Sequence, residues 1–485
     1  MSEPVAVSAR RVTFDVAVQI GARILNLALG VVVTLLLVRG LGSRGFGIWS
    51  ALFAVGQIAG SFGDLGLNGI TISRAARDTE REGSWLGALL SLRLLLAIPI
   101  TLASLTAILL IAPTNQARLA GALIAGVMLV GAPTALGVVF QLRVRNHIPM
   151  AIMTLNSIVW GAGVVVITAI SGGIAAFAAV FLASSALTSA VTVLLALRMA
   201  HVRLGGTTGL WRPLLRVGVV TGAAGILVTL YVRLDQVLVL QLAGSRQAGL
   251  YGAAYRLLDQ IQFIPISMMT TLFPLIAASY RSRPEQARSL LQTAGEYLTM
   301  ASLPILAFTI VAASPIMTRL FGPEFAAAAP ALPVLAGVFV LISFGYLAGN
   351  MVVILELQRR FLRFAAVGLA INALLNIAFI PSFGFLAAAW ITLATEVVVM
   401  TLGMRAVLGA LAMRPRFGRL LRILLAALIM GLTTWLARVA GAPLGGLVVV
   451  SAVGYLSCLL LLRVIKVGEV LALLRKDTSS FGAQM

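Results

Sequence analysis

Residues 74–112 read RAARDTEREGSWLGALLSLRLLLAIPITLASLTAILLIA, a charged segment with three arginines followed by a long apolar run. The run from residue 85 to residue 112 contains one charged side chain, Arg93. It exceeds the roughly 20 apolar residues that cross a bilayer as a helix. Inside hydrocarbon every backbone N–H and C=O group must be paired within the protein, which favours a helix. The segment therefore predicts a membrane helix that begins beside a charged, arginine-containing loop.

The same pattern continues along the whole chain. The 485 residues are 60% hydrophobic and only 11% charged, with a mean hydropathy of +1.05. A water-soluble chain of this length would need more polar residues to cover its surface. We therefore predict an all-α polytopic membrane protein with about fourteen spans. The expected spans are 15–38, 46–72, 85–112, 119–142, 149–170, 174–197, 214–242, 248–279, 290–318, 328–355, 362–381, 384–404, 420–438 and 443–463.

The basic residues predict how these helices are oriented. With the N-terminus in the cytoplasm, 26 of the 36 Lys and Arg residues lie on cytoplasmic segments and 6 lie on outer loops. The other four lie inside spans. Because short cytoplasmic loops are rich in Lys and Arg, both termini are expected in the cytoplasm. Anionic lipid headgroups then account for the net charge of +21, and no nucleic-acid partner is expected.

An internal repeat divides the chain. GSRGFGIW at residues 42–49 recurs as GSRQAGLY at residues 244–251, each on a predicted outer hairpin. The copies are six spans apart, an even number, so the two halves share one orientation in the membrane. A weaker echo relates Asn156 to Asn372. We expect a six-helix lobe in residues 1–200, a second in residues 201–410, and two additional helices with a cytoplasmic tail in residues 411–485.

Polar residues follow one face of the first span. Asp15, Gln19, Arg23 and Asn26 are separated by four, four and three residues, which places them on the same side of a helix. A charge inside a bilayer is costly unless it faces protein or water. The stripe is therefore expected to line an internal cavity, with a seam of interhelical hydrogen bonds as the alternative.

Other spans carry isolated charges. Asp64 lies near the cytoplasmic end of the second span, on one face with Asn68, where it either caps the helix or pairs with a cation. Arg93 and Glu396 each stand alone on their helices, which makes them weaker candidates. Glu296 is expected near the membrane interface. These residues are functional candidates because intramembrane charges are usually retained for a purpose.

The seventh and eighth spans contain the densest group of charges. Arg233 and Asp235 lie on the first, and Arg256 and Asp259 lie on the second. Asp235 and Arg256 each stand about ten residues from the hairpin turn, which places both about 15 Å deep, near the bilayer centre. We expect either a structural ion pair or a hydrated cavity that handles an anion or couples to an ion.

The sequence argues against several other chemistries. Residues 40–45 fit G-x-G-x-x-G, but a dinucleotide site needs a preceding strand, and this segment follows a membrane helix. The sequence lacks the G-x-x-x-x-G-K-[ST] motif, and His147 and His201 lie on cytoplasmic loops. No spacing suggests a metal centre or a catalytic group. We therefore expect a transporter without a bound cofactor or metal, and not an enzyme.

Several segments, in order along the chain, resemble the motifs of one family. They are VRGLGSRGFG at 38–47, DLGL at 64–67, YVRLDQ at 231–236 with GLYGAAYR at 249–256, LFGPEF at 320–325 and GFLAAA at 384–389. They are similar to motifs of the bacterial oligosaccharide flippases, which include O-antigen and polysaccharide flippases. These belong to the multidrug/oligosaccharidyl-lipid/polysaccharide exporter superfamily.

The resemblance implies two six-helix lobes with two extra helices, in the bacterial cytoplasmic membrane. It also implies alternating-access movement of a polyprenyl-pyrophosphate-linked oligosaccharide for lipopolysaccharide or exopolysaccharide synthesis. Membrane lipids and polysaccharide assembly proteins are the implied partners, and an H⁺ or Na⁺ gradient or the membrane potential is the implied driving force. The expected substrate-binding residues are Arg23, Asn26, Arg93, Arg233 and Arg256, and the expected coupling or gating residues are Asp64, Asp235, Asp259 and Glu396.

Two alternatives stay open at this point. The first is an ion-coupled exporter of small molecules or drugs from the same superfamily. The second is a membrane enzyme, a polysaccharide polymerase or a glycosyltransferase, against which the short outer loops argue.

Overall fold

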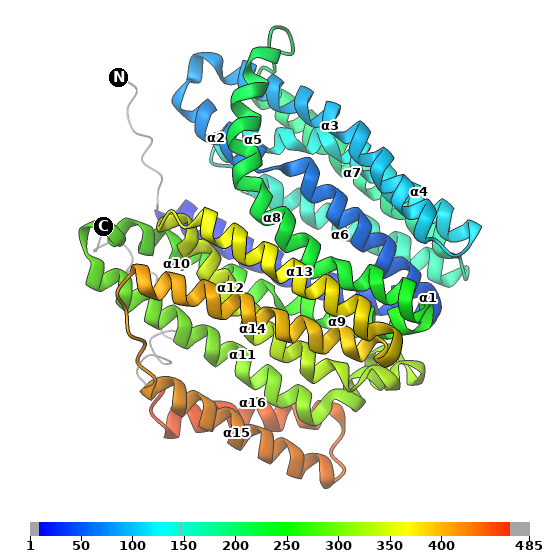
Figure 1. Cartoon of the computed structure of the whole chain (residues 1–485), viewed down its shortest axis with the longest axis vertical. Coiled ribbons are helices and arrows are strands. Elements are labelled where there is room, and N and C mark those ends of the chain that lie inside the picture. The colour runs from blue at the N-terminus through cyan, green and yellow to red at the C-terminus, as the bar shows by residue number, and fades with distance from the viewer. Residues whose placement is uncertain (1–8, 146, 466–485) are drawn as a thin grey trace. The chain divides into compact units, whose positions relative to one another are not determined.

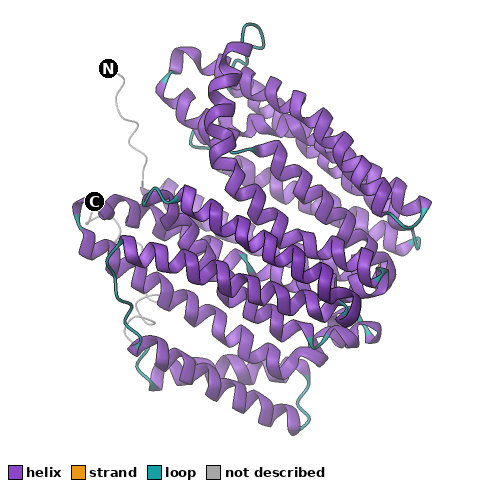
Figure 2. Cartoon of the chain, in the orientation of Figure 1, coloured by secondary structure: helices purple, strands orange, loops and turns teal. Residues whose placement is uncertain are grey.

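The computed structural model describes residues 9–145 and 147–465, and for residues 9–24 and 220–221 it describes the backbone alone. Every regular element in this part of the chain is a helix (Figure 2). The elements are α1 (Ala9–Asp64), α2 (Leu67–Arg77), η1 (Thr79–Arg81), α3 (Glu82–Ile111), α4 (Asn115–Gly131), η2 (Ala132–Gly137), α5 (Val138–Leu142), α6 (His147–Ala169), α7 (Ile174–Met199), α8 (Thr208–Ala243), α9 (Ser245–Ile261), α10 (Phe263–Ser282), α11 (Pro284–Phe321), η3 (Pro323–Ala328), α12 (Ala331–Ile354), α13 (Gln358–Phe383), α14 (Phe385–Ala410), α15 (Gly418–Val439) and α16 (Leu444–Leu461).

The expected polytopic all-α architecture is confirmed. Thirteen helical segments of the described residues are long and apolar enough to cross a membrane. The first of these segments, Leu25–Arg77, covers most of the span expected at 15–38 and all of the one expected at 46–72, which agrees with about fourteen crossings. The apolar runs form helices because a helix pairs its backbone groups internally, as hydrocarbon requires. The chain is a multi-pass membrane protein.

The outer loop expected between the first two spans is reduced to one residue. α1 continues through residues 39–45 and departs from helical geometry at Gly42, which has φ 62° and ψ 178°. Glycine reaches this backbone region readily because it has no Cβ. The two halves of α1 therefore join directly at Gly42.

The second expected span is also interrupted. α1 ends at Asp64, Leu65 and Gly66 have left-handed φ values of 44° and 69°, and α2 begins at Leu67. The prediction that Asp64 and Asn68 share one face of a continuous helix is therefore wrong. A left-handed backbone is unusual for leucine, so the surrounding packing must hold this bend.

Two glycines of α8 make room for the bend. A Cβ built on Gly218 would lie 2.9 Å from the carbonyl oxygen of Leu65, and one on Gly222 would lie 2.6 Å from its carbonyl carbon. Real Cβ atoms do not approach backbone that closely. The α8 backbone therefore packs directly on the Leu65 turn.

The fourth expected span, 119–142, is likewise not one helix. α4 ends at Gly131, the 3₁₀ segment η2 follows with Pro133 in its first turn, and α5 begins at Val138. Proline lacks the N–H that would continue the α-helical hydrogen bonds. The fourth crossing is therefore built from three short pieces.

The chain divides into two compact units, which we describe separately. The N-terminal unit contains residues 10–253 and 365–388, and the C-terminal unit contains residues 254–364 and the described residues from 389 onward. In the N-terminal unit α3 packs on α4, α4 on α7 and α7 on α6. In the C-terminal unit α11 packs on α10, α12 and α15, and α15 lies beside α16 (Figure 1).

Candidate functional site

The clearest polar site in the N-terminal unit contains two charged residues that the sequence singled out. Nη2 of Arg93 on α3 donates to Oδ1 of Asp64 at 2.6 Å and to Oδ1 of Asn68 at 3.3 Å. The side chain of Arg93 is 15% exposed and that of Asp64 is 48% exposed. We call Asp64, Asn68 and Arg93 the Arg93 cluster. Of the two roles expected for Asp64, the structure places it in an ion pair.

The bend at Leu65 explains how two helices serve one arginine. Asp64 is the last residue of α1, and Asn68 is the second residue of α2. The left-handed residues between them change the direction of the chain, and both side chains still reach the same nitrogen of Arg93. A carboxylate and an amide on one guanidinium offset part of the cost of placing a cation in the membrane.

Arg93 also lines a cavity of about 200 Å³. Three glycines, Gly60, Gly63 and Gly131, contribute to its wall, so the backbone is close to the space. The Nε of Arg93 is buried and has no hydrogen-bond partner among the described residues. A buried donor left unpaired costs about 1–3 kcal/mol, which a bound acceptor would recover. Because arginine is always charged, an anionic acceptor such as phosphate suits this position.

Of the polar stripe on the first span, Asn26 makes a contact between helices. Its side chain is buried, and its Nδ2 donates to Oγ1 of Thr154 on α6 at 2.7 Å. This is the interhelical hydrogen bond expected as the alternative for the stripe. The side chains of Asp15, Gln19 and Arg23 lie outside the described residues.

A second polar group surrounds Asp235 on α8. The Asp235 side chain is fully buried and accepts hydrogen bonds from the hydroxyl of Tyr251 on α9 and, at 2.7 Å, from the backbone N–H of Gln236. In the amide orientation that satisfies its neighbours, Gln236 donates to the Ser50 carbonyl oxygen at 3.2 Å and accepts from Nη1 of Arg233 at 3.3 Å. The group therefore joins α8 to α9 and to α1.

Sequence reasoning missed Tyr251 as a partner of Asp235. The signal was in the repeat, where Tyr251 stands at the position of Trp49 in the first copy. A buried tyrosine hydroxyl normally finds a hydrogen-bond partner, whereas the indole at Trp49 stacks on Trp160 with ring centroids 5.9 Å apart. The two halves therefore use equivalent positions for different contacts.

Two charged candidates of the C-terminal unit, Arg256 and Asp259, belong to a chain of polar contacts that runs from α9 to α12. Nη1 of Arg256 lies 3.9 Å from Oδ2 of Asp259, one turn later on α9. Oδ1 of Asp259 accepts from Nε2 of Gln262 at 3.3 Å, and Oε1 of Gln262 accepts from the Tyr346 hydroxyl at 2.9 Å. Sequence reasoning missed Gln262 and Tyr346, because their meeting depends on how α12 packs. Glu396, on α14, is almost fully buried.

The described part of the chain offers no obvious metal centre. Nowhere in residues 9–145 and 147–465 do three His, Cys, Asp or Glu side chains gather where they could hold one ion. The acidic candidates Asp64, Asp235 and Asp259 each have their own polar partners instead.

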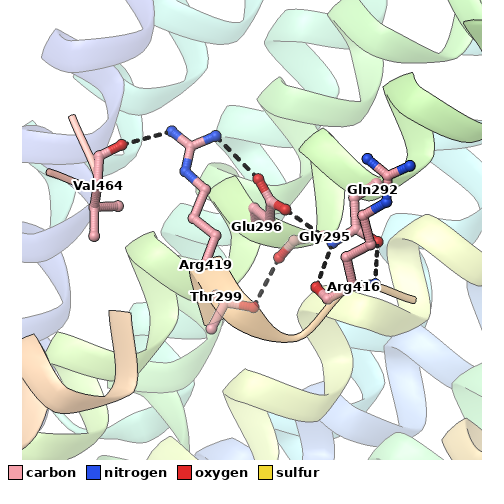
Figure 3. A network of polar contacts seen from close by, with 7 residues as sticks. All are labelled: Gln292, Gly295, Glu296, Thr299, Arg416, Arg419 and Val464. Carbon is pink, nitrogen blue, oxygen red and sulfur yellow. Dashed lines mark hydrogen bonds and ion pairs between the residues drawn. The ribbon is translucent and has the colours of Figure 1, made fainter. Parts of the chain in front are cut away.

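A further network, which sequence reasoning also missed, attaches the C-terminal helix pair to α11 (Figure 3). Arg419 donates from Nη1 to Oε2 of Glu296 at 3.0 Å and from Nη2 to the carbonyl oxygen of Val464 at 2.8 Å. Gln292 donates from Nε2 to Oε1 of Glu296 and to the carbonyl oxygen of Arg416, each at 2.8 Å. Glu296 is buried. The network links α11 to the start of α15, to the segment that precedes α15 and to the segment that follows α16.

The two repeated hairpins pack against each other within the N-terminal unit. A Cβ on Gly47 would meet the backbone of Ser245 and Gly249, and a Cβ on Gly249 would meet the backbone of Ser43. Gln247 accepts from the backbone N–H of Phe385 at 3.0 Å, so the turn between α13 and α14 joins the same contact. Segments that resemble separate family motifs therefore meet at one place.

The chain is similar to known proteins in both sequence and fold. The sequence model of one family, described as polysaccharide biosynthesis protein, matches residues 12–279, more than half of the chain. The chain belongs to the polysaccharide biosynthesis protein family. The matched region includes the Arg93 cluster and the Arg233–Asp259 segment. No curated protein sequence matches the chain.

Solved structures of transporters share the fold. The lipid II flippase MurJ in an inward closed conformation has a TM-score of 0.71 at 14% identity, covering 93% of this chain and 99% of MurJ. A multidrug resistance MATE family transporter of the MOP superfamily, in its inward-facing conformation, has a TM-score of 0.66 at 15% identity, covering 82% and 98%. A MOP superfamily transporter from Pyrococcus furiosus has a TM-score of 0.53 at 17% identity, covering 84% and 96%. The predicted resemblance is confirmed by the family model for the sequence and by these transporters for the fold.

Proposed function

We propose that this polysaccharide biosynthesis protein is a flippase for a polyprenyl-pyrophosphate-linked oligosaccharide in the bacterial cytoplasmic membrane. Membership of the family supports a role in polysaccharide synthesis, and the transporter fold supports translocation rather than catalysis. The observation that carries the proposal is Arg93, a mostly buried cation that lines a cavity and whose Nε–H has no hydrogen-bond partner among the described residues. Such a group suits the phosphates of the carrier.

Translocation of this substrate requires a polar path through the membrane. A pyrophosphate with a glycan attached cannot cross about 30 Å of hydrocarbon unaided, because it would lose its hydration without compensation. Guanidinium groups replace water by charge-assisted hydrogen bonds to phosphate oxygens. In this proposal the pyrophosphate accepts a hydrogen bond from the Nε–H of Arg93. It also competes with Asp64 for the other N–H groups of the guanidinium.

The other predicted residues have roles that stay proposals. Arg23, Asn26, Arg233 and Arg256 would contact the substrate along its path. Release of Asp64 from Arg93 would couple transport to an H⁺ or Na⁺ gradient or to the membrane potential, and Asp235, Asp259 and Glu396 are the further coupling candidates. Alternating access would expose the path to each side in turn, and polysaccharide assembly proteins would receive the product.

The test replaces Arg93 in cells that depend on this chain for surface polysaccharide. We expect Arg93→Ala to reduce polysaccharide output at least about tenfold at normal protein level, since one charge-assisted hydrogen bond contributes about 1.5–3 kcal/mol. Arg93→Lys should retain part of the output, because it keeps the charge. Arg118→Ala is the control, since Arg118 is exposed and its neighbour Asn115 lies on the same helix. Full output from Arg93→Ala would contradict the proposal.

The same cells separate the two alternatives. A small-molecule exporter, which the MATE-like fold accommodates, predicts drug sensitivity on deletion with normal polysaccharide. A polymerase or glycosyltransferase predicts that the purified protein lengthens glycans in liposomes without moving the lipid. If the protein is a flippase, neither result is expected. Deletion should instead cause lipid-linked oligosaccharide to accumulate in the inner leaflet.

A further inference from the structure

A second cavity in the N-terminal unit shares Asn68 with the Arg93 cluster. It has a volume of about 380 Å³, within the range of small-molecule sites, and its walls come from α2, η2, α5, α6 and α7. Its polar lining consists of neutral amides and hydroxyls, with no charged side chain among the described residues that border it. The polar lining residues are Asn68, Gln141, Asn156, Thr134, Thr188 and Thr192.

The hydroxyl groups of this lining are acceptors toward the cavity. Each threonine donates its one hydroxyl proton to a carbonyl oxygen of its own helical segment: Thr134 to Gly131 at 2.6 Å, Thr188 to Ser184 at 2.9 Å and Thr192 to Thr188 at 2.7 Å. Each oxygen keeps its two lone pairs as hydrogen-bond acceptors. A ligand in this cavity is therefore favoured if it donates hydrogen bonds.

Asn156 adds a further acceptor. Its Oδ1 is buried and has no hydrogen-bond partner among the described residues, and its side chain borders the cavity. A half-turn of the carboxamide exchanges Oδ1 with Nδ2, so the residue can present either an acceptor or a donor to a ligand. Asn68, also in the lining, accepts from Arg93 through Oδ1, which leaves its Nδ2 protons as donors.

This chemistry discriminates between ligand classes. A phosphate would face hydrogen-bond acceptors, with no cation among the lining residues. The free-energy cost of removing its hydration would therefore not be offset. A bare metal ion needs several oxygens at about 2.3–2.6 Å, and this space is far wider than such a shell. Phe140, Pro149 and Ile152 add apolar walls that can cover the flat face of a ring. A neutral ligand with hydroxyl or amide donors, a sugar, fits all three features.

We propose that this cavity binds the sugar attached directly to the pyrophosphate while Arg93 binds the pyrophosphate itself. The proposal rests on the proposed flippase function and adds a glycan-selective subsite to it. Asn68 touches Arg93 and borders the cavity, so the two subsites are adjacent, as the two groups are in the substrate. The amide and threonine lining then selects for a hydroxyl- or acetamido-bearing sugar, independently of the carrier.

The test compares two ligands on the full chain in nanodiscs. The probes are a polyprenyl pyrophosphate with no sugar and the same lipid carrying one N-acetylglucosamine. We expect the native chain to bind the glycosylated lipid about tenfold more tightly than the bare one. Asn156→Leu should remove that preference and leave the affinity for the bare lipid unchanged. Thr188→Val, which keeps the side-chain shape, should reduce the preference about threefold.

Controls make each outcome decisive. Ser157→Ala lies next to Asn156 on α6, and the Ser157 hydroxyl donates to its own helix, so it should keep the full preference. Arg93→Ala should weaken both lipids equally. If the native chain binds neither lipid, the proposed function itself is overturned. If both bind and neither Asn156→Leu nor Thr188→Val changes their ratio, the sugar subsite is overturned. The same holds if Asn156→Leu removes only an effect of added Na⁺, which would make the cavity a cation site.

Discussion

At the scale of single residues, the Arg93 cluster shows how a membrane protein keeps a cation in hydrocarbon. Arg93 is mostly buried, and its counter-ion Asp64 is about half exposed. An ion pair in this setting is worth more than a surface pair, because little water screens it. The half-exposed carboxylate has room to move away from the pair, whereas the guanidinium is largely enclosed by protein. A bound anion would therefore replace Asp64 at low cost.

This asymmetry predicts a stability difference between two ion pairs of equal length. In both pairs, Asp64–Arg93 and Glu285–Arg288, a guanidinium nitrogen lies 2.6 Å from a carboxylate oxygen. The side chain of Glu285 is 86% exposed. We expect Asp64→Asn to destabilise the protein by about 2 kcal/mol, less than the 3–5 kcal/mol of a fully buried pair because Asp64 is half exposed. Glu285→Gln should cost less than about 1 kcal/mol. Thermal unfolding in detergent compares the two, and equal losses would contradict the argument.

The pair itself was beyond sequence reasoning, although both residues were named as candidates. Arg93 stands alone on its helix, and nothing in the periodicity of α3 says which neighbour it faces. Asp64 and Asn68 were placed on one helix face, whereas the left-handed Leu65 separates them. The space that permits this bend comes from Gly218 and Gly222, which lie far along the chain on α8. The contact between Asp64 and Arg93 therefore depends on tertiary packing, which the sequence pattern does not show.

At the scale of helices and turns, hydropathy predicts where the chain crosses the membrane but not how turns are built. Backbone pairing in hydrocarbon leaves the helix as the one regular choice for each apolar run. The turns depend on single residues instead. Gly42 forms the kink where a loop was expected, and Pro133 lies where an expected helix is interrupted. The Glu296–Arg419 contact likewise depends on how α15 docks on α11, which no local pattern encodes.

The contact between the repeated hairpins predicts a sharp response to a single methyl group. A Cβ on Gly249 would lie 2.7 Å from the carbonyl carbon of Ser43, so Gly249→Ala forces backbone apart. We expect a loss of about 1–3 kcal/mol, the usual range for overpacking. Gly225→Ala on α8 is the matched control, since a Cβ there would have no atom within 4 Å and alanine favours a helix. Thermal unfolding that ranks the two variants the other way would refute the close contact.

At the scale of the whole molecule, the distribution of charge predicts an orientation that the helices alone do not. The same bundle of apolar helices can be inserted either way up, and Lys and Arg near the ends of spans decide between the two. The split of 26 basic residues to 6 predicts that the hairpin at residues 244–251 lies outside and that the segment around His201 lies in the cytoplasm. The proposed direction of transport depends on this assignment.

Single cysteines test that orientation. Cys458 is the one cysteine of the chain, so Cys458→Ser provides a background without thiols. Arg246 and His201 are both exposed and lie on opposite ends of the predicted spans. In intact cells a membrane-impermeant maleimide should label Arg246→Cys, and it should label His201→Cys only after the membrane is opened. The reverse pattern would place the basic segments outside, against the anionic cytoplasmic leaflet that attracts them, and would reverse the side from which Arg93 receives its ligand.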